Sequence, residues 1–235
     1  MSLLETIKDV VITPIHPKGK PIIIAAAVIA VILYLLSGFL GFLGAVGLAF
    51  CVYFFRDPQR TSPQSDGCVL ATGDGVICNI AQSPLPAELG ADDTPYHKIS
   101  IFLNVFNVHV NRLPVSGEVT RELYIPGKFL NAALDKASTD NERNILTIDT
   151  AKGDTIAFVQ IAGFVARRIV SQINQGDQAV AGERYGLIKF GSRCDIYIPA
   201  HYELLVREGM TCIGGETMLA THKEFDASAL TWATS

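Results

Sequence analysis

The most informative absence in this sequence is charge between Pro21 and Phe55, where no Asp, Glu, Lys or Arg occurs. A helix needs roughly 20 apolar residues to cross a bilayer core, so this segment suffices for one span and falls short of two full ones. Glycines cluster between Gly38 and Gly47, where they would permit a break or close helix packing. The run is too long for a buried core helix, and it is too long and starts too late for a signal peptide. We therefore expect a helical membrane anchor at 21–55, preceded by a short leader at 1–20.

Basic residues flank the apolar segment on both sides. Lys18 and Lys20 precede it, and Arg56 and Arg60 follow it. Because Lys and Arg tend to stay on the cytoplasmic side, this favours a hairpin with both ends inside, although a single tilted span stays open. The expectation is a cytoplasmic (inner) membrane protein whose domain at 56–235 faces the cytoplasm.

The chain also lacks the patterns of several other protein classes. Its net charge of −4 and pI near 5.7 argue against a nucleic-acid partner. The five cysteines form no C-x-x-C pair and are odd in number, which indicates neither a zinc site of that type nor a disulfide framework. This cysteine pattern suits a reducing compartment.

Beyond the anchor, short β-like runs alternate with turn residues, and only Lys128–Lys136 invites a helix. A G-x5-G-E pattern occurs at 176–183 and again at 209–216. It is similar to the turns of barrel-sandwich folds. We therefore expect a mainly β (α+β) fold, namely a barrel-sandwich-like domain with one or two short helices.

The stretch GLIKFGSRCDIYIPA reads as a buried strand interrupted by Gly191 and Ser192. A glycine inside a strand marks a bulge or a close backbone approach. The serine belongs to no G-x-S-x-G elbow, and Asp195 stands where an S-x-x-K motif needs its lysine. A remaining use of the hydroxyl is attack on the preceding glycine carbonyl, which would need a base and a group that orients the base. Cys194 is expected to be a packed small side chain rather than a reactive thiol.

His109 and Asp74 are residues of the types that such a reaction requires. Strand alternation would place His109 with Asn107 and Asn111 on one face, and spacing alone favours a solvent face over a polar pocket wall. Asp74 lies between two glycines, a pattern typical of a tight turn.

Several motifs link these stretches to one family. In chain order they are FFRDPQR (54–60), GDG (73–75), FNVHVNRLPVSGEV (106–119), YIPGKFLNA (124–132), DNERN (140–144) and KFGSRCDIYIP (189–199). Together they resemble the phosphatidylserine decarboxylase proenzymes, particularly their short bacterial and archaeal branch.

The resemblance implies self-cleavage between Gly191 and Ser192, which would give a β chain of 1–191 and an α chain of 192–235. Ser192 would become a pyruvoyl group, the only cofactor, with no metal or nucleotide. Its carbonyl would form a Schiff base with phosphatidylserine in the membrane, and loss of carbon dioxide would yield phosphatidylethanolamine. The α and β chains would stay together as a heterodimer, with further oligomerisation left open.

The resemblance also implies site residues. His109 matches a family histidine with acid–base work, and Asp74 matches the acidic partner in self-cleavage. This sequence departs from the longer members, which have a second histidine where Arg112 stands and Leu-Gly-Ser-Thr in place of Phe-Gly-Ser-Arg. Either His109 serves both processing and decarboxylation, or another group fills the gap.

Two other functions stay open. A membrane-anchored barrel-sandwich adaptor would explain the anchor and the G-x5-G-E pattern, but not the Gly-Ser break. A pyruvoyl-dependent decarboxylase of another amino-group substrate would explain the break, but not the anchor.

Overall fold

The computed structural model describes residues 13–90, 93–128, 140–163, 168–189 and 191–235. The chain divides into two units, residues 1–59 and residues 60–235. Apart from Lys128, the helix expected at Lys128–Lys136 lies outside the described residues.

The first unit is a pair of apolar helices. A short 3-10 turn, η1 (Pro17–Gly19), leads into α2 (Lys20–Leu36), and the extended residue Ser37 separates it from α3 (Gly38–Phe54). A Cβ added at Gly44 would lie 2.8 Å from the Cα of Ala30, so this glycine allows the two helices to touch. The segment is therefore a helical hairpin, as the glycine cluster suggested.

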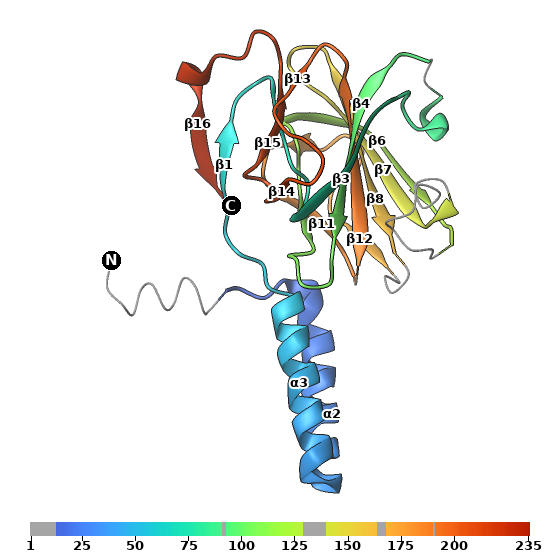
Figure 1. Ribbon diagram of the computed structural model, residues 1–235, viewed down its shortest axis with the longest axis vertical. Helices are drawn as coiled ribbons and strands as arrows, with labels where there is room; N and C mark the ends of the chain where they lie inside the picture. Colours follow the sequence, from blue (N-terminus) through green and yellow to red (C-terminus); the bar gives the residue numbers. More distant parts are fainter. Residues whose placement is uncertain (1–12, 91–92, 129–139, 164–167, 190) are drawn as a thin grey trace. The chain divides into compact units, whose positions relative to one another are not determined.

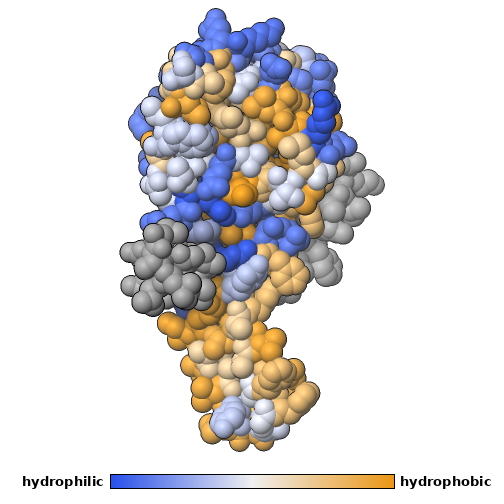
Figure 2. Space-filling model, turned by 60° about the vertical axis from the view of Figure 1, so that its left-hand side comes forward, coloured by the Kyte–Doolittle hydropathy of each residue, from blue (hydrophilic) through white to orange (hydrophobic). Residues whose placement is uncertain are grey.

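The hairpin exposes large apolar side chains along its length. Leu35, Leu36 and Phe39 are 69–77% exposed, and the hairpin is coloured as hydrophobic in Figure 2. By length and composition, one described helix, Pro17–Leu36, is sufficient to cross a membrane, and Gly38–Phe54 is shorter. A helix of 17 residues rises about 26 Å, somewhat less than a hydrocarbon core of about 30 Å.

The second unit is mostly β-structure (Figure 1). Its strands are β1 (Thr61–Gln64), β2 (Cys68–Leu70), β3 (Gly75–Ser83), β4 (Tyr96–Leu103), β5 (Val110–Arg112), β6 (Gly117–Ile125), β7 (Arg143–Asp149), β8 (Thr155–Ala162), β9 (Ile169–Ser171), β10 (Gln178–Ala179), β11 (Arg184–Ile188), β12 (Ser192–Pro199), β13 (Glu203–Leu204), β14 (Thr211–Cys212), β15 (Met218–Thr221) and β16 (Thr231–Thr234). Two further 3-10 turns are η2 (Ala87–Leu89) and η3 (Ala227–Ala229). The expected mainly β fold with short helices is confirmed.

One curled sheet dominates this domain. Its strand order is β10-β6-β7-β8-β12-β4-β3-β14, and two smaller sheets, β5-β11-β9 and β13-β15-β2, accompany it. Strand β12 lies in the middle and pairs antiparallel with β4 and β8 along its length. Its side chains alternate between two cores: Cys194, Ile196 and Ile198 join the larger apolar cluster, whereas Tyr197 joins a smaller one on the opposite face. The central strand is thus buried on both faces.

The G-x5-G-E pattern marks equivalent turns at the two ends of the large sheet. The first copy contains β10, which pairs with β6, and the second contains β14, which pairs with β3. Gly182 and Gly215 have φ of 82° and 78°, a backbone conformation that favours glycine. A Cβ on Gly215 would lie 3.4 Å from the carbonyl oxygen of Gly182, so the two turns lie against each other.

Candidate active site

The Gly191–Ser192 dipeptide lies between two strands that belong to different sheets. Strand β11 ends at Ile188 and pairs with β5 and β9, whereas β12 begins at Ser192 and pairs with β4 and β8. Gly191 has φ of 68°, in the left-handed region. The interruption read from the sequence is therefore a junction between sheets, and each flanking strand has partners of its own.

Ser192 is completely buried at the start of β12. It is 0% exposed and pairs with Leu103 of β4 and Ala162 of β8. Its Oγ has no hydrogen-bond partner among the described residues. A buried hydroxyl without a partner costs about 1–3 kcal/mol. Such a group in a well-packed interior calls for an explanation, and reactivity is one.

His109 contacts the same junction, and the solvent-face prediction for it is wrong. The residue is 0% exposed, and its Nε2 accepts a hydrogen bond from the N–H of Gly191 at 3.3 Å. The prediction extended strand alternation back to Phe106, but β5 begins only at Val110. The preceding residues form a turn in which the N–H of Asn107 donates to Asn104 O.

The two hydrogen bonds of His109 define its tautomer. Its Nδ1 lies 3.0 Å from the carbonyl oxygen of Asn107, which only accepts, so Nδ1 carries the proton. Because Nε2 accepts from Gly191, it presents a lone pair. These two contacts orient the ring of His109 with Nε2 toward the Gly191–Ser192 junction.

Asp74 lies in a bend at residues 72–74 that leads directly into β3. Its Oδ2 lies 2.8 Å from Nη2 of Arg60, and its Oδ1 accepts from the N–H of Gly214 at 2.9 Å. A Cβ on the neighbouring Gly73 would lie 3.1 Å from Leu103, the β4 residue paired with Ser192. The bend of Asp74 therefore packs against the strand that borders the serine.

Arg112, which stands where longer family members have a histidine, is buried and points toward the C-terminal residues. Its Nη1 donates to the carbonyl oxygen of Gly182 at 2.7 Å and to the Oγ of Ser235 at 2.6 Å. Its Nη2 lies 3.3 Å from the carbonyl oxygen of Ser235. These contacts tie a turn to the end of the chain, which is a structural task.

A chain of neutral amides that sequence reasoning missed lies on the Ser192 face of β12. Gln160 donates to Asn111 Oδ1 at 2.8 Å, and Asn111 Nδ2 lies 3.5 Å from Sγ of Cys194. Asn144 reaches Gln160 at 3.5 Å. All four are at most 2% exposed. One signal was available, since Gln160 is a lone polar residue inside the apolar run IAFVQIA.

The opposite face of β12 carries charges instead. Arg193 donates to Asp195 at 2.6 and 3.2 Å and to Ser100 Oγ at 2.7 Å. Lys98 completes the group, with its Nζ 3.2 Å from Asp195. Arg193 and Asp195 are at most 1% exposed. The cationic and anionic groups thus compensate one another directly behind the junction.

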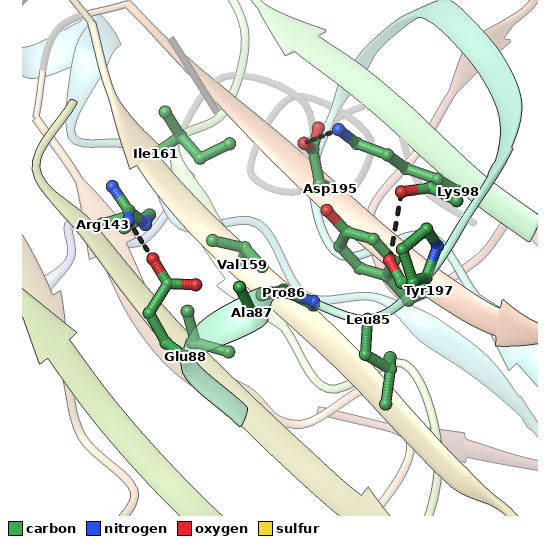
Figure 3. Close-up of a pocket in the computed structure, with 13 residues that line it drawn as sticks. Leu85, Pro86, Ala87, Glu88, Lys98, Arg143, Val159, Ile161, Asp195 and Tyr197 are labelled. Atoms are coloured by element: carbon green, nitrogen blue, oxygen red, sulfur yellow. Dashed lines mark hydrogen bonds and ion pairs between the residues drawn. The ribbon is translucent and has the colours of Figure 1, made fainter. Parts of the chain in front are cut away.

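A cavity of about 280 Å³ borders this charged cluster (Figure 3). Asp195 and Tyr197 line it from β12, and ion pairs of Asp195 with Lys98 and of Arg143 with Glu88 form two of its walls. Strand alternation separates it from Ser192, whose side chain faces the other way. The cavity therefore lies behind the candidate site and does not contain it.

The cysteine that follows the junction is not arranged as a nucleophile. Burial raises the pKa of the Cys194 thiol to about 12, and the residue is 1% exposed. At neutral pH the thiol keeps its proton, and the thiolate is the reactive form. The structure agrees with the expectation of a packed small side chain.

Comparisons with known proteins give the family. The family model for phosphatidylserine decarboxylase matches residues 48–220. A phosphatidylserine decarboxylase proenzyme of Azorhizobium caulinodans is 51% identical over 229 residues, covering 97% of this chain and 96% of the relative. Those of Granulibacter bethesdensis and Ruegeria pomeroyi are 48% and 49% identical, covering 94% and 91% of this chain and 90% and 97% of the relatives.

These matches define a class of lipid-modifying decarboxylases that are named as proenzymes. The chain belongs to the phosphatidylserine decarboxylase family. The resemblance drawn from its motifs is thereby confirmed.

Proposed function

We propose that this protein decarboxylates phosphatidylserine to phosphatidylethanolamine after cutting its own chain between Gly191 and Ser192. The observation that carries the proposal is the buried, unpartnered Oγ of Ser192, adjacent to a left-handed glycine whose N–H is held by His109. Family membership supports the decarboxylase activity.

The cut requires only groups of the chain and water. Oγ of Ser192 attacks the carbonyl carbon of Gly191, the C–N bond breaks, an ester forms, and the hydroxyl proton passes to the nitrogen. Removal of the α-proton of Ser192 then breaks the Cβ–Oγ bond, which releases the carboxylate of Gly191 and leaves dehydroalanine. Hydrolysis of its imine form releases ammonia and leaves a pyruvoyl group. We assign the proton removals to Nε2 of His109, because that nitrogen lies at the junction, 3.3 Å from the nitrogen of Gly191; the hydrogen bond from Gly191 would open before Nε2 accepts a proton.

The residues at the start of β12 fit a pyruvoyl group. Cys194 and the amides of Asn111 and Gln160 surround this end of the strand with neutral groups, and pairing with β4 and β8 would hold the new α-chain terminus after the cut. The group would supply an electrophilic carbonyl and an electron sink for loss of carbon dioxide. His109 would return a proton to the substrate carbon.

Asp74 is assigned to self-cleavage as the acidic partner of this relay. The ion pair with Arg60 and the hydrogen bond from the N–H of Gly214 fix the position of its carboxylate. Because Arg112 is engaged with Gly182 and Ser235, we propose that His109 serves both processing and turnover.

The apolar hairpin suits a lipid substrate. It would hold residues 21–55 in the cytoplasmic membrane with the β domain on the cytoplasmic side, where the phosphatidylserine headgroup can reach the site while its acyl chains stay in the bilayer. The adaptor alternative does not fit the family, and a soluble amino-acid substrate does not fit the hairpin.

The test is the intact mass of the denatured, full-length protein. We expect two chains, 1–191 and 192–235, with the second lighter than a serine start and lacking a free amino terminus. Ser192→Ala should give one chain and no phosphatidylethanolamine from phosphatidylserine vesicles. Ser62→Ala is the matched control, because Ser62 Oγ is also buried without a described partner and lies elsewhere. Two normal chains from Ser192→Ala would overturn the proposal.

A further inference from the structure

Three side chains with metal-ligating atoms converge at the far end of β12. They are Asp154, between β7 and β8, His201, just after β12, and His222, just after β15. One ligand atom from each lies within 4.8 Å of the other two. Nε2 of His201 is 3.3 Å from Oδ2 of Asp154. The three are remote in sequence, so no spacing pattern revealed them.

The chemistry of this set suits a transition metal. Imidazole nitrogen and carboxylate oxygen both bind Zn²⁺ at about 2.0–2.2 Å in tetrahedral sites, where neighbouring ligand atoms lie about 3.4 Å apart. The His201–Asp154 distance already matches that separation. The two edges that involve His222 are each at most 4.8 Å long, so closing them to about 3.4 Å requires side-chain adjustments of at most about 1.4 Å.

Tyr202 makes this a built site. Its hydroxyl donates to Oδ2 of Asp154 at 3.1 Å, and the residue is 4% exposed. Its ring packs against both imidazoles, with centroids 5.0 Å from His201 and 5.3 Å from His222. Outer hydrogen bonds of this kind orient metal ligands.

An ion pair holds two of the contributing segments together. Lys152, in the turn of Asp154, lies 3.6 Å from Glu224, which follows His222. The N–H of His222 also donates to the carbonyl oxygen of Gly67 at 2.7 Å. The segments of Asp154 and His222 are thus linked by contacts that do not use the ligand atoms.

We propose that Asp154, His201 and His222 bind a zinc ion that ties the two chains of the matured protein together. Asp154 precedes the cut, whereas both histidines follow it, so the ion would link residues 1–191 to residues 192–235. The linking part rests on the proposed function, and the binding part does not. About 23 Å of strand separates Ser192 from Pro199, so the ion would take no part in the reaction.

Two existing hydrogen bonds must open for the ion to bind. The first joins Nε2 of His201 to Oδ2 of Asp154 at 3.3 Å, because a nitrogen that donates its proton to a carboxylate has no lone pair left for a metal. The second is made by His222. The N–H of Glu224 donates to Nδ1 of His222 at 3.1 Å. Ligation through Nδ1 uses that lone pair, and ligation through Nε2 leaves the proton on Nδ1, so neither leaves an acceptor for Glu224. The amide of Glu224 is therefore a reporter, and its nuclear magnetic resonance should shift when zinc binds.

The experiment titrates untagged, detergent-solubilised full-length protein with Zn²⁺ alone. We expect one ion retained per chain after desalting, and none in Asp154→Asn or His222→Gln. Tyr202→Phe should bind about 10–100-fold more weakly, because it removes only the outer hydrogen bond. His97→Gln, a histidine outside the cluster, is the matched control and should bind as the parent does. Equal retention by the parent and His222→Gln, or no retention by the parent, would overturn the site.

A second arm separates this proposal from the proposed function. The uncleaved Ser192→Ala chain should still retain one zinc ion, so zinc binding stands even if the chain proves never to be cut. In matured protein, zinc should raise the urea concentration at which residues 192–235 dissociate, and EDTA should reverse the shift. If zinc binds but leaves that urea concentration unchanged, the site stands and only the claim that zinc ties the two chains together is overturned.

Discussion

The two faces of β12 differ in how their polar groups are satisfied. On one face, the hydroxyl of Ser192 has no hydrogen-bond partner among the described residues. The same face carries the protonated thiol of Cys194 and the amides of Asn111 and Gln160. On the other face, Arg193 and Asp195 form a bidentate ion pair, and Ser100 and Lys98 add further contacts. The same strand therefore carries an unsatisfied polar group and a compensated charge cluster back to back.

The face of Ser192 suits a reactive group, whereas the face of Arg193 and Asp195 suits a rigid support. A hydroxyl without a hydrogen-bond partner does not have to break a bond before it attacks the neighbouring carbonyl. The neutral groups on this face form no ion pair that would restrain the hydroxyl. The ion cluster is expensive to assemble in a buried position but fixes the geometry of the strand once complete. We infer that the charged face positions the strand while the neutral face carries the chemistry.

Replacing His109 should produce the largest effect on the neutral face. His109→Ala removes the lone pair directed at Gly191, and general acid–base groups contribute about 10²–10⁴-fold to rate. We expect maturation to slow by that order, followed as the time course of two-chain formation on a denaturing gel. His97→Ala is the control and should mature at the parental rate.

The same variant tests whether one histidine serves both steps. Any matured fraction of His109→Ala should also convert phosphatidylserine at a rate reduced by a similar order, measured as phosphatidylethanolamine formed per matured chain. Parental turnover per matured chain would limit His109 to processing. Parental maturation would remove it from the self-cleavage relay.

Breaking the charged face should reduce stability. Asp195→Asn leaves Arg193 without its buried counter-charge, and breaking a buried pair costs about 3–5 kcal/mol. The measurement is the free energy of unfolding in urea, with every variant carrying Ser192→Ala so that one chain unfolds. Asp140→Asn disrupts the exposed Lys128–Asp140 pair, whose side chains are 71% and 40% exposed, and should cost less than about 1 kcal/mol. If Asp195→Asn and Asp140→Asn lowered the free energy of unfolding equally, the buried cluster would not hold β12 in place.

Much of the fold could be predicted from sequence because it depends on local patterns. The uncharged run predicted an apolar helical segment, for which the basic flanks favoured a hairpin while a single span stayed open. Short β-like runs between turn residues predicted the β domain. Strand order could not be predicted, because the partners of β12 come from segments around residues 96–103 and 155–162. Which segments pair depends on packing across the whole sheet, which no local window contains.

In the candidate site, too, local patterns predicted some residues, and contacts between distant segments hid the others. Gly191 and Ser192 were visible as an interruption, and the glycines beside Asp74 predicted a turn. His109 was misplaced by spacing, because alternation was assumed through a turn, and only the family resemblance assigned it to the site. The amides of Asn111 and Gln160 meet across 49 positions of sequence, so their contact could not be read from either segment.

Cysteine labelling tests whether the neutral face of β12 is closed to solvent. Burial raises the pKa of Cys68, Cys194 and Cys212 to about 12, whereas Cys78 is exposed. A free cysteine titrates near pH ~8.5, so between pH 9 and 11 the unfolded chain loses these thiol protons while the folded chain keeps them. Iodoacetamide at pH 9 should therefore modify Cys78 in the folded protein and the three buried thiols only after denaturation, as read by peptide mass spectrometry.

Enzymatic activity should survive this labelling, because no step assigned to the site uses a thiol. Rapid modification of Cys194 in the folded state would mean that the neutral face opens to solvent, and in the uncleaved chain water could then bond the hydroxyl of Ser192.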